Sequence, residues 1–205
     1  MHWGKSVKIT VSPLTPLVLA AFVALSSPIL LGALLAAAAL HEWGHMAALR
    51  HFGGRISRLT VSPFGAEMTI ADTARLSYGA EILVTLAGPA VNILLAVVLG
   101  LLGGRWESAY VFAGAQLVLG LFNLIPVRPL DGGRLLWLTV AWLTEPFSAD
   151  RIASASGVVF AVVLFALGAM VFYRTGNSPF LLLGALGLLL SSLREIGLVK
   201  SSRAR

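Results

Sequence analysis

Long apolar stretches separated by short polar turns run along most of the chain. Most of them approach the roughly 20 residues that a helix needs to cross a bilayer, and the first and fourth are shorter and must borrow from their flanks. A further apolar piece at 135–143 is too short to span and is expected to form a half-helix after a break. The six predicted spans cover residues 13–25, 28–49, 81–102, 109–125, 153–173 and 179–198.

Two other segments show the two-residue alternation that is typical of strands. In the first, residues 56–61 lead through a Ser62-Pro63 turn into an alternating run at 64–70, which predicts a short hairpin. Residues 7–12 alternate in the same way, so we expect a small sheet at the membrane rim. This sheet can shield a polar site inside the membrane as a plug and can also offer an edge to an extended substrate, since the two roles are compatible. The second role makes Phe64, Ala66 and Met68 candidate substrate-binding residues.

The composition supports the spans and excludes a soluble domain. Apolar residues make up 58% of the chain, charged residues only 12%, and the mean hydropathy is +0.89. We therefore predict an all-α polytopic membrane protein with about six transmembrane helices and the small β-hairpin or sheet. It forms a single domain over residues 1–205, with a core at 28–145 and C-terminal helices at 153–198. The first span has no obvious cleavage site and is expected to be retained.

The basic residues predict the orientation. If both termini and the loops after spans two and four share one side, that side holds every one of the 15 Lys and Arg residues except Arg105 and Arg174. The positive-inside rule then places both termini and the sheet in the cytosol. Titratable residues inside the second span then lie nearer to the cytosolic face of the membrane. The net charge of +6 reflects this topology and attraction to anionic lipid, and we expect no nucleic acid as a partner.

The sequence His41-Glu42-Trp43-Gly44-His45 lies inside the second span, where titratable side chains are costly and mark function. On a helix, His41 and His45 share one face and can bind a single Zn²⁺, while Glu42 is placed to accept a proton from an activated water. The absence of cysteine excludes thiolate ligands, so further ligands must be His, Asp or Glu.

A broken helix further along the chain offers a third ligand. The segment Asn123-Leu-Ile-Pro-Val-Arg-Pro-Leu-Asp131-Gly-Gly interrupts two apolar stretches, and broken backbone at membrane depth is tolerated where it lines a wet cavity. Asp131 would complete a His₂Asp set with an open position, as catalytic zinc requires. Alternatively, Asp131 caps the following helix. Asn123 either contacts a substrate carbonyl or oxyanion or holds two helices together.

Taken together, these motifs resemble the site-2 protease family of intramembrane zinc metalloproteases. The segments HEWGH and NLIPVRPLDGG match its two hallmarks, and Ala87-Gly-Pro-Ala-Val-Asn92 is similar to its third-helix element, although a Gly88-Pro89 pair more often serves close packing or a kink. The resemblance implies His41, His45 and Asp131 as zinc ligands, Glu42 as general base and Asn123 as a substrate contact. The spacing most resembles the sporulation stage-IV branch, which processes a sigma-factor precursor. CBS and PDZ domains, which some members carry, are not in these 205 residues.

We therefore expect an intramembrane zinc endopeptidase that cleaves a membrane-associated protein, with a sigma-factor precursor during sporulation as the first candidate. A membrane inhibitor protein is a further candidate partner. One alternative is a general site-2 protease acting on anti-sigma factors or signal-peptide remnants. The other is a non-enzymatic metal-binding membrane protein or transporter, which would distribute polar residues over several spans rather than concentrate them at one site.

Overall fold

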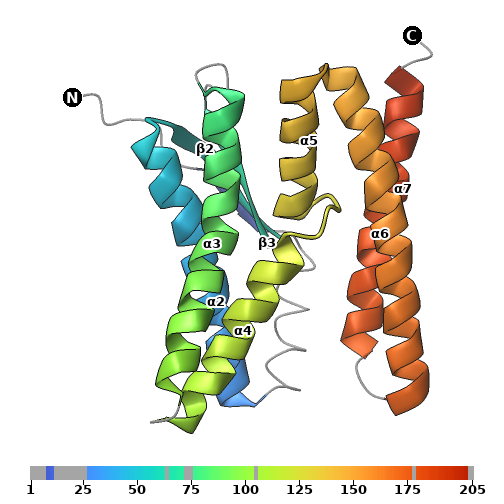
Figure 1. Ribbon diagram of the computed structural model, residues 1–205. Coiled ribbons are helices and arrows are strands. Elements are labelled where there is room, and N and C mark those ends of the chain that lie inside the picture. The colour runs from blue at the N-terminus through green and yellow to red at the C-terminus, as the bar shows by residue number, and fades with distance from the viewer. Residues whose placement is uncertain are drawn as a thin grey trace. The chain divides into compact units, whose positions relative to one another are not determined.

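The computed structural model describes residues 8–11, 27–62, 65–71, 76–103, 106–176 and 179–202. These residues fall into two compact units, residues 1–121 and 122–205, and each is described by itself. The described part holds six helices and three strands (Figure 1). They are β1 (Lys8–Val11), α2 (Pro28–His51), β2 (Arg55–Ser62), β3 (Gly65–Ala71), α3 (Tyr78–Leu102), α4 (Glu107–Asn123), α5 (Asp131–Leu143), α6 (Pro146–Thr175) and α7 (Pro179–Ser202).

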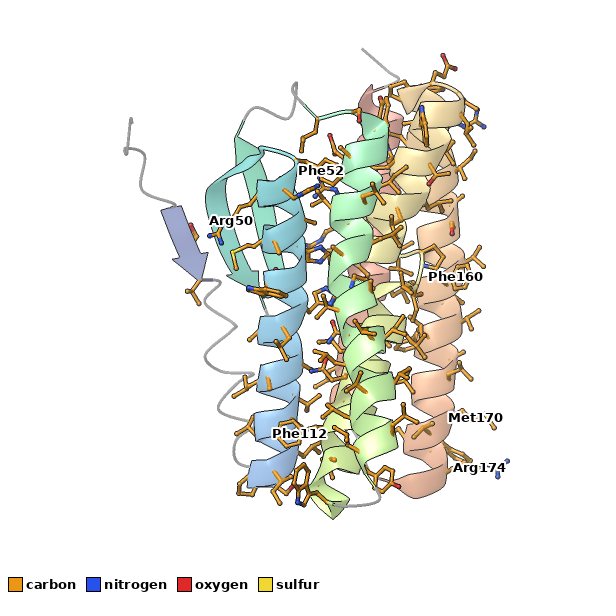
Figure 2. All side chains as sticks on the ribbon, turned by 60° about the vertical axis from the view of Figure 1, so that its left-hand side comes forward. Arg50, Phe52, Phe112, Phe160, Met170 and Arg174 are labelled. Atoms are coloured by element: carbon orange, nitrogen blue, oxygen red, sulfur yellow. The ribbon has the colours of Figure 1, made fainter. Side chains whose placement is uncertain are left out.

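The first unit is built on helices α2, α3 and α4, which lie side by side (Figure 1). Helix α2 begins at a Ser27 cap whose hydroxyl accepts from the Leu30 N–H, and α3 begins at an equivalent Ser77 cap. Small residues let α2 and α4 approach closely, since Ala33, Ala37 and Ala115 form one buried cluster. Figure 2 shows Phe112 of α4 near the Pro28 end of α2, with Arg50 at the other end of that helix.

The sheet of the first unit has the strand order β1-β2-β3. Strand β1 pairs in parallel with β2, and β2 pairs antiparallel with β3, so the alternating runs seen in the sequence do form strands. The register places Leu59 opposite Met68 and Val61 opposite Ala66, with an irregularity between Ile56 and Arg58. Among the described strands, β3 is paired on one side only.

The second unit consists of α5, α6, α7 and the loop that precedes α5. Helix α6 packs against both α5 and α7. The core of this unit contains Val127 and Leu130 from the loop, Ala161 from α6 and Leu188 from α7. Gly176 ends α6 with a φ of 62°, the left-handed conformation that favours glycine. Figure 2 shows Phe160, Met170 and Arg174 following one another towards that end of α6.

The helices agree in part with the predicted spans. Among the described residues, three helical segments are long and apolar enough to cross a membrane, namely Pro28–His51, Tyr78–Leu102 and Pro146–Arg174. Two others contain shorter apolar stretches, Ser108–Asn123 and Leu182–Arg194. The protein is a multi-pass membrane protein, while the number of about six spans and the single-domain division stay predictions. The predicted span at 13–25 lies outside the described residues. The half-helix expected at 135–143 begins four residues earlier, at Asp131.

Candidate metal centre

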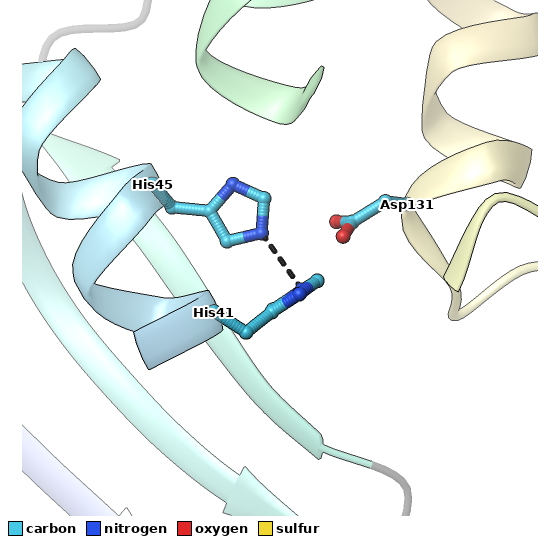
Figure 3. Close-up of side chains that lie close together, drawn as sticks. All are labelled: His41, His45 and Asp131. Atoms are coloured by element: carbon cyan, nitrogen blue, oxygen red, sulfur yellow. Dashed lines mark hydrogen bonds between the residues drawn. The ribbon is translucent and has the colours of Figure 1, made fainter. Parts of the chain in front are cut away.

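His41 and His45 project from one face of α2, as their four-residue spacing predicts (Figure 3). Both side chains are buried, and their rings meet edge to face with centroids 4.7 Å apart. The two Nε2 atoms lie 3.1 Å from each other. The helix therefore presents two imidazole nitrogens to the same small volume.

The backbone of α3 fixes the tautomer of His45. Its Nδ1 lies 2.8 Å from the Val84 carbonyl oxygen. A carbonyl can only accept a hydrogen bond, so Nδ1 carries the proton and donates it. In the neutral ring, Nε2 is then an acceptor with its lone pair directed towards His41.

A buried asparagine fixes the tautomer of His41 in the same way. The Asn92 amide nitrogen donates to the Ala37 carbonyl at 3.1 Å, which directs the amide oxygen towards His41. That oxygen lies 2.7 Å from His41 Nδ1, which must therefore be the donor. The sequence analysis named Asn92 only as part of the segment similar to a third-helix element, and the contact with His41 shows that it orients a candidate ligand. The one signal for this role was an amide inside an apolar span.

The arrangement of the two histidines fits a metal ion. If both Nδ1 atoms carry the protons, two Nε2 acceptors face each other and neither can donate to the other. Two nitrogens bound to tetrahedral zinc at their usual bond lengths would be about 3.3 Å apart, close to the observed 3.1 Å. Histidine ligands commonly donate their second ring N–H to a carbonyl, as both do here.

Asp131 completes a group whose residue types suit zinc. Among the described residues, His41, His45 and Asp131 are the His, Asp or Glu side chains whose types could together hold an ion, and Figure 3 draws the three. Two imidazoles and one carboxylate leave a tetrahedral ion with one open position, which is the composition of catalytic zinc sites. The donor set therefore fits the metal that the sequence predicted.

The alternative interpretation of Asp131 as the cap of α5 is wrong. The cap position is Leu130, which makes no side-chain cap hydrogen bond, and Asp131 is the first residue of the helix itself.

Gly132 and Gly133 allow the loop to pack closely, because a Cβ on Gly133 would lie 2.6 Å from the Arg128 backbone nitrogen. The loop folds back tightly on the first turn of α5, and only glycine fits there.

A polar cluster in the second unit holds this loop. The Trp137 indole N–H of α5 donates to Asp150 of α6 at 2.7 Å. The Arg128 guanidinium of the loop lies 3.6 Å from the same carboxylate oxygen and 5.8 Å from the Trp137 ring centroid. Since Arg128 precedes Asp131 by three residues, the cluster ties the backbone near Asp131 to two helices.

Glycines set the distance between α2 and α3. A Cβ on Gly44 would lie 2.7 Å from the Ala87 carbonyl oxygen, and a Cβ on Gly88 would collide with the His45 ring, closest to Nε2. The sequence interpretation of Gly88 as a packing residue therefore fits, and the atom it packs against belongs to a candidate ligand.

The remaining predicted site residues are placed as follows. Glu42 is half-buried on α2 beside His41, and Asn123 is the last residue of α4, just before the broken segment. Ala66 and Met68 lie in β3, and Phe64 lies outside the described residues. Their roles in catalysis and substrate binding stay predictions.

Comparison with known proteins places this site in a family. The model of peptidase family M50 matches residues 29–106 and 103–167, which include both histidines and Asp131. A zinc metalloprotease of Methanocaldococcus jannaschii is 27% identical over 136 residues, 63% of this chain and 39% of that protein. The protein Rip3 of Mycobacterium tuberculosis is 35% identical over 155 residues, 70% of this chain and 39% of Rip3. The chain thus spans about two fifths of the length of these curated relatives.

The fold has a solved counterpart. The site-2 protease from Methanocaldococcus jannaschii superposes with a TM-score of 0.72 at 23% identity, over 95% of this chain and 93% of that one. Similarity at this identity shows a shared fold, and the family model adds the matched sequence. On these grounds the chain belongs to peptidase family M50.

Proposed function

We propose that this protein is an intramembrane zinc endopeptidase that cleaves a membrane-associated protein. The observation that carries the proposal is the pair of His41 and His45 Nε2 acceptors, each fixed by a hydrogen bond at Nδ1 and 3.1 Å from the other. Both stand on a helix apolar enough to span the bilayer. Family M50 membership and the relative described as a zinc metalloprotease support the same reaction.

The site residues divide the work in a defined way. His41, His45 and Asp131 hold the ion, which when bound supplies Lewis acidity for activating water and polarising a carbonyl. Glu42 accepts the proton of the attacking water and delivers it to the leaving amine. Asn123 donates a hydrogen bond to the substrate carbonyl or oxyanion. The apolar surroundings strengthen each of these interactions, because they lower the local dielectric.

The substrate is a membrane-associated protein, and a sigma-factor precursor is the first candidate. The sequence pattern favours the sporulation branch, and Stage IV sporulation protein FB of Bacillus subtilis is 29% identical over 129 residues, 61% of this chain and 45% of that protein. The archaeal and mycobacterial relatives match similarly well, so the matches do not single out the sporulation branch. Anti-sigma factors and signal-peptide remnants stay the alternative substrate class.

Co-expression tests this function directly. The protein is produced with membrane-tethered sigma-factor precursors, with anti-sigma factors or with signal-peptide remnants, and the products are sized by mass spectrometry. We expect cleavage within or beside the membrane segment of one class, and none with His45→Ala. Intact substrates in every class, from a chain that carries zinc, would contradict the proposed protease activity.

Asp131 distinguishes the proposed zinc site from a site of two histidines alone. Asp131→Asn should lower zinc affinity, because a neutral amide oxygen is a weaker ligand than a carboxylate. Metal analysis after dialysis against a chelator measures this loss, with Glu145→Gln as a control at an exposed carboxylate of the same unit. Unchanged zinc content and normal cleavage in Asp131→Asn would remove Asp131 from the ligand set.

The orientation that we propose has both termini and the sheet in the cytosol. Reporter fusions after Arg58 and Arg205 should therefore report the cytosol, and a fusion after Arg105 should report the opposite side. A non-cytosolic result at Arg58 would overturn the orientation and, with it, access to the site from the cytosol.

Strand β3 is proposed to hold the substrate in an extended form. A helical substrate hides its carbonyls in hydrogen bonds, and adding it as a strand to the β3 edge would expose them. Met68→Pro should slow cleavage several-fold with zinc content unchanged, because it distorts the strand backbone, whereas Met68→Leu should be mild. Cysteine crosslinking between positions 64–70 and the substrate gives a second readout. Normal cleavage by Met68→Pro and by Ala66→Pro, without any crosslink, would leave the sheet as a plug.

A further inference from the structure

A third helix reaches the histidine pair through an amide that the proposed mechanism does not use. Gln116 of α4 lies with its side-chain oxygen 2.5 Å from the Asn92 amide nitrogen, and Asn92 in turn contacts His41. Gln116 is 1% exposed, Asn92 0% and His41 5%, so bulk water does not compete for these groups. The three residues form a buried chain of hydrogen bonds across α4, α3 and α2.

The polarity of this chain follows from one fixed group. The Ala37 carbonyl can only accept, which places the Asn92 nitrogen on that side and the Asn92 oxygen towards His41. The same nitrogen also points to Gln116, so the Gln116 atom that it meets must be the carbonyl oxygen. Both Asn92 N–H groups are thus occupied, and turning the amide over would place its oxygen against the Ala37 carbonyl oxygen.

Gln116 is needed because the Ala37 carbonyl is shared. Ala37 lies four positions before His41 in helix α2, so its carbonyl also accepts the His41 backbone N–H. Gln116 supplies the Asn92 amide with an acceptor of its own. Gly120, one turn further on α4, allows this approach, since a Cβ there would lie 3.0 Å from the Asn92 Cβ.

We propose that Gln116 is a positioning residue of the metal centre: it holds the Asn92 amide, which keeps the proton of His41 on Nδ1 and its Nε2 lone pair towards the ion. The proposal rests on the zinc site of the proposed function. Without the Gln116 acceptor, Asn92 can turn or withdraw, and His41 then populates the tautomer that carries the proton on Nε2. That tautomer cannot bind a metal through Nε2, so zinc affinity falls.

The test compares zinc affinity and a spectroscopic signature in the full chain. Gln116→Met removes the acceptor at similar size, with Gln116→Leu as a second such variant, whereas Gln116→Glu keeps an acceptor oxygen in either protonation state. Leu117→Met is the control on the adjacent, exposed position of α4. Chelator competition gives the zinc dissociation constant, and the visible absorption of Co²⁺ put in place of zinc reports the geometry around the ion.

We expect Gln116→Met to weaken zinc binding about tenfold, the size typical of a lost partner of a metal-binding histidine, and to alter the Co²⁺ absorption. Gln116→Glu and Leu117→Met should stay close to wild type. The double variant Asn92→Leu/Gln116→Met should bind zinc no more weakly than Asn92→Leu alone, because Gln116 acts through Asn92.

Three results would overturn this role. The first is wild-type zinc affinity and Co²⁺ absorption in both Gln116→Met and Gln116→Leu. The second is an equal loss of zinc affinity in Gln116→Met and Gln116→Glu. The third is a loss of zinc affinity in the double variant that equals the sum of the two single losses. A wild-type protein that binds no zinc would instead overturn the proposed function together with the inference, so the two failures are distinguishable.

Discussion

Glu42→Gln should lose nearly all peptide-bond cleavage while keeping its zinc. The amide is close in size to the carboxylate, so helix α2 and the neighbouring histidines keep their positions. It cannot accept a proton from the attacking water, and a positioned general base typically contributes about 10²- to 10⁴-fold in rate. The measurement is the cleavage rate of a membrane-protein substrate in liposomes, with zinc content determined on the same preparation.

The control for Glu42 is Glu145→Gln, which makes the same chemical change at an exposed residue before α6. It should leave both rate and zinc content unchanged. Full activity in Glu42→Gln would remove Glu42 as the base, and loss of zinc in that variant would instead indicate that its carboxylate supports the ion.

Gly88→Ala should lose zinc as well as activity, although it adds one methyl group to a helix. The added Cβ would collide with the His45 ring at Nε2, the atom assigned to the metal. Either the ring turns away or α3 moves from α2, and both break the hydrogen bond between His45 and the Val84 carbonyl. We expect zinc affinity to fall by about a hundredfold, at the upper end of the range for a disturbed histidine ligand.

Gly100→Ala is the matched control, because it makes the same change on α3 at a position with nothing within 4 Å of the added Cβ. Zinc content by metal analysis should be normal in Gly100→Ala and low in Gly88→Ala. Normal zinc binding in Gly88→Ala would show that α2 and α3 approach each other less closely than the structure indicates.

Sequence patterns predicted the parts of this protein that depend on local chemistry. Apolar stretches of bilayer length became α2, α3 and α6, and the hairpin predicted from residues 56–61 and the alternating run at 64–70 became β2 and β3. The four-residue spacing of His41 and His45 requires only a helix to bring both rings to one face. Asp131 stood out as an acidic residue in a broken apolar segment, and the HEWGH motif upstream favoured a ligand role over a helix cap.

The sequence did not reveal the residues that support the ligands. Asn92 and Gln116 are separated from His41 by 51 and 75 positions, and their contacts depend on how three helices pack, which no local pattern encodes. Helix α5 is capped by Leu130 rather than Asp131 because of the backbone path of the preceding loop. Gly132 and Gly133 allow the loop to take that path close to the first turn of the helix.

Zinc content and cleavage measured together test the central claim most directly. The purified protein is stripped with a chelator and titrated with zinc, and the cleavage rate of a membrane-protein substrate is followed at each addition. The proposed function predicts no cleavage without zinc, a rise that saturates at one ion per chain, and neither binding nor cleavage in His41→Ala/His45→Ala. Cleavage that persists after complete removal of zinc, or tight zinc binding without both histidines, would contradict it.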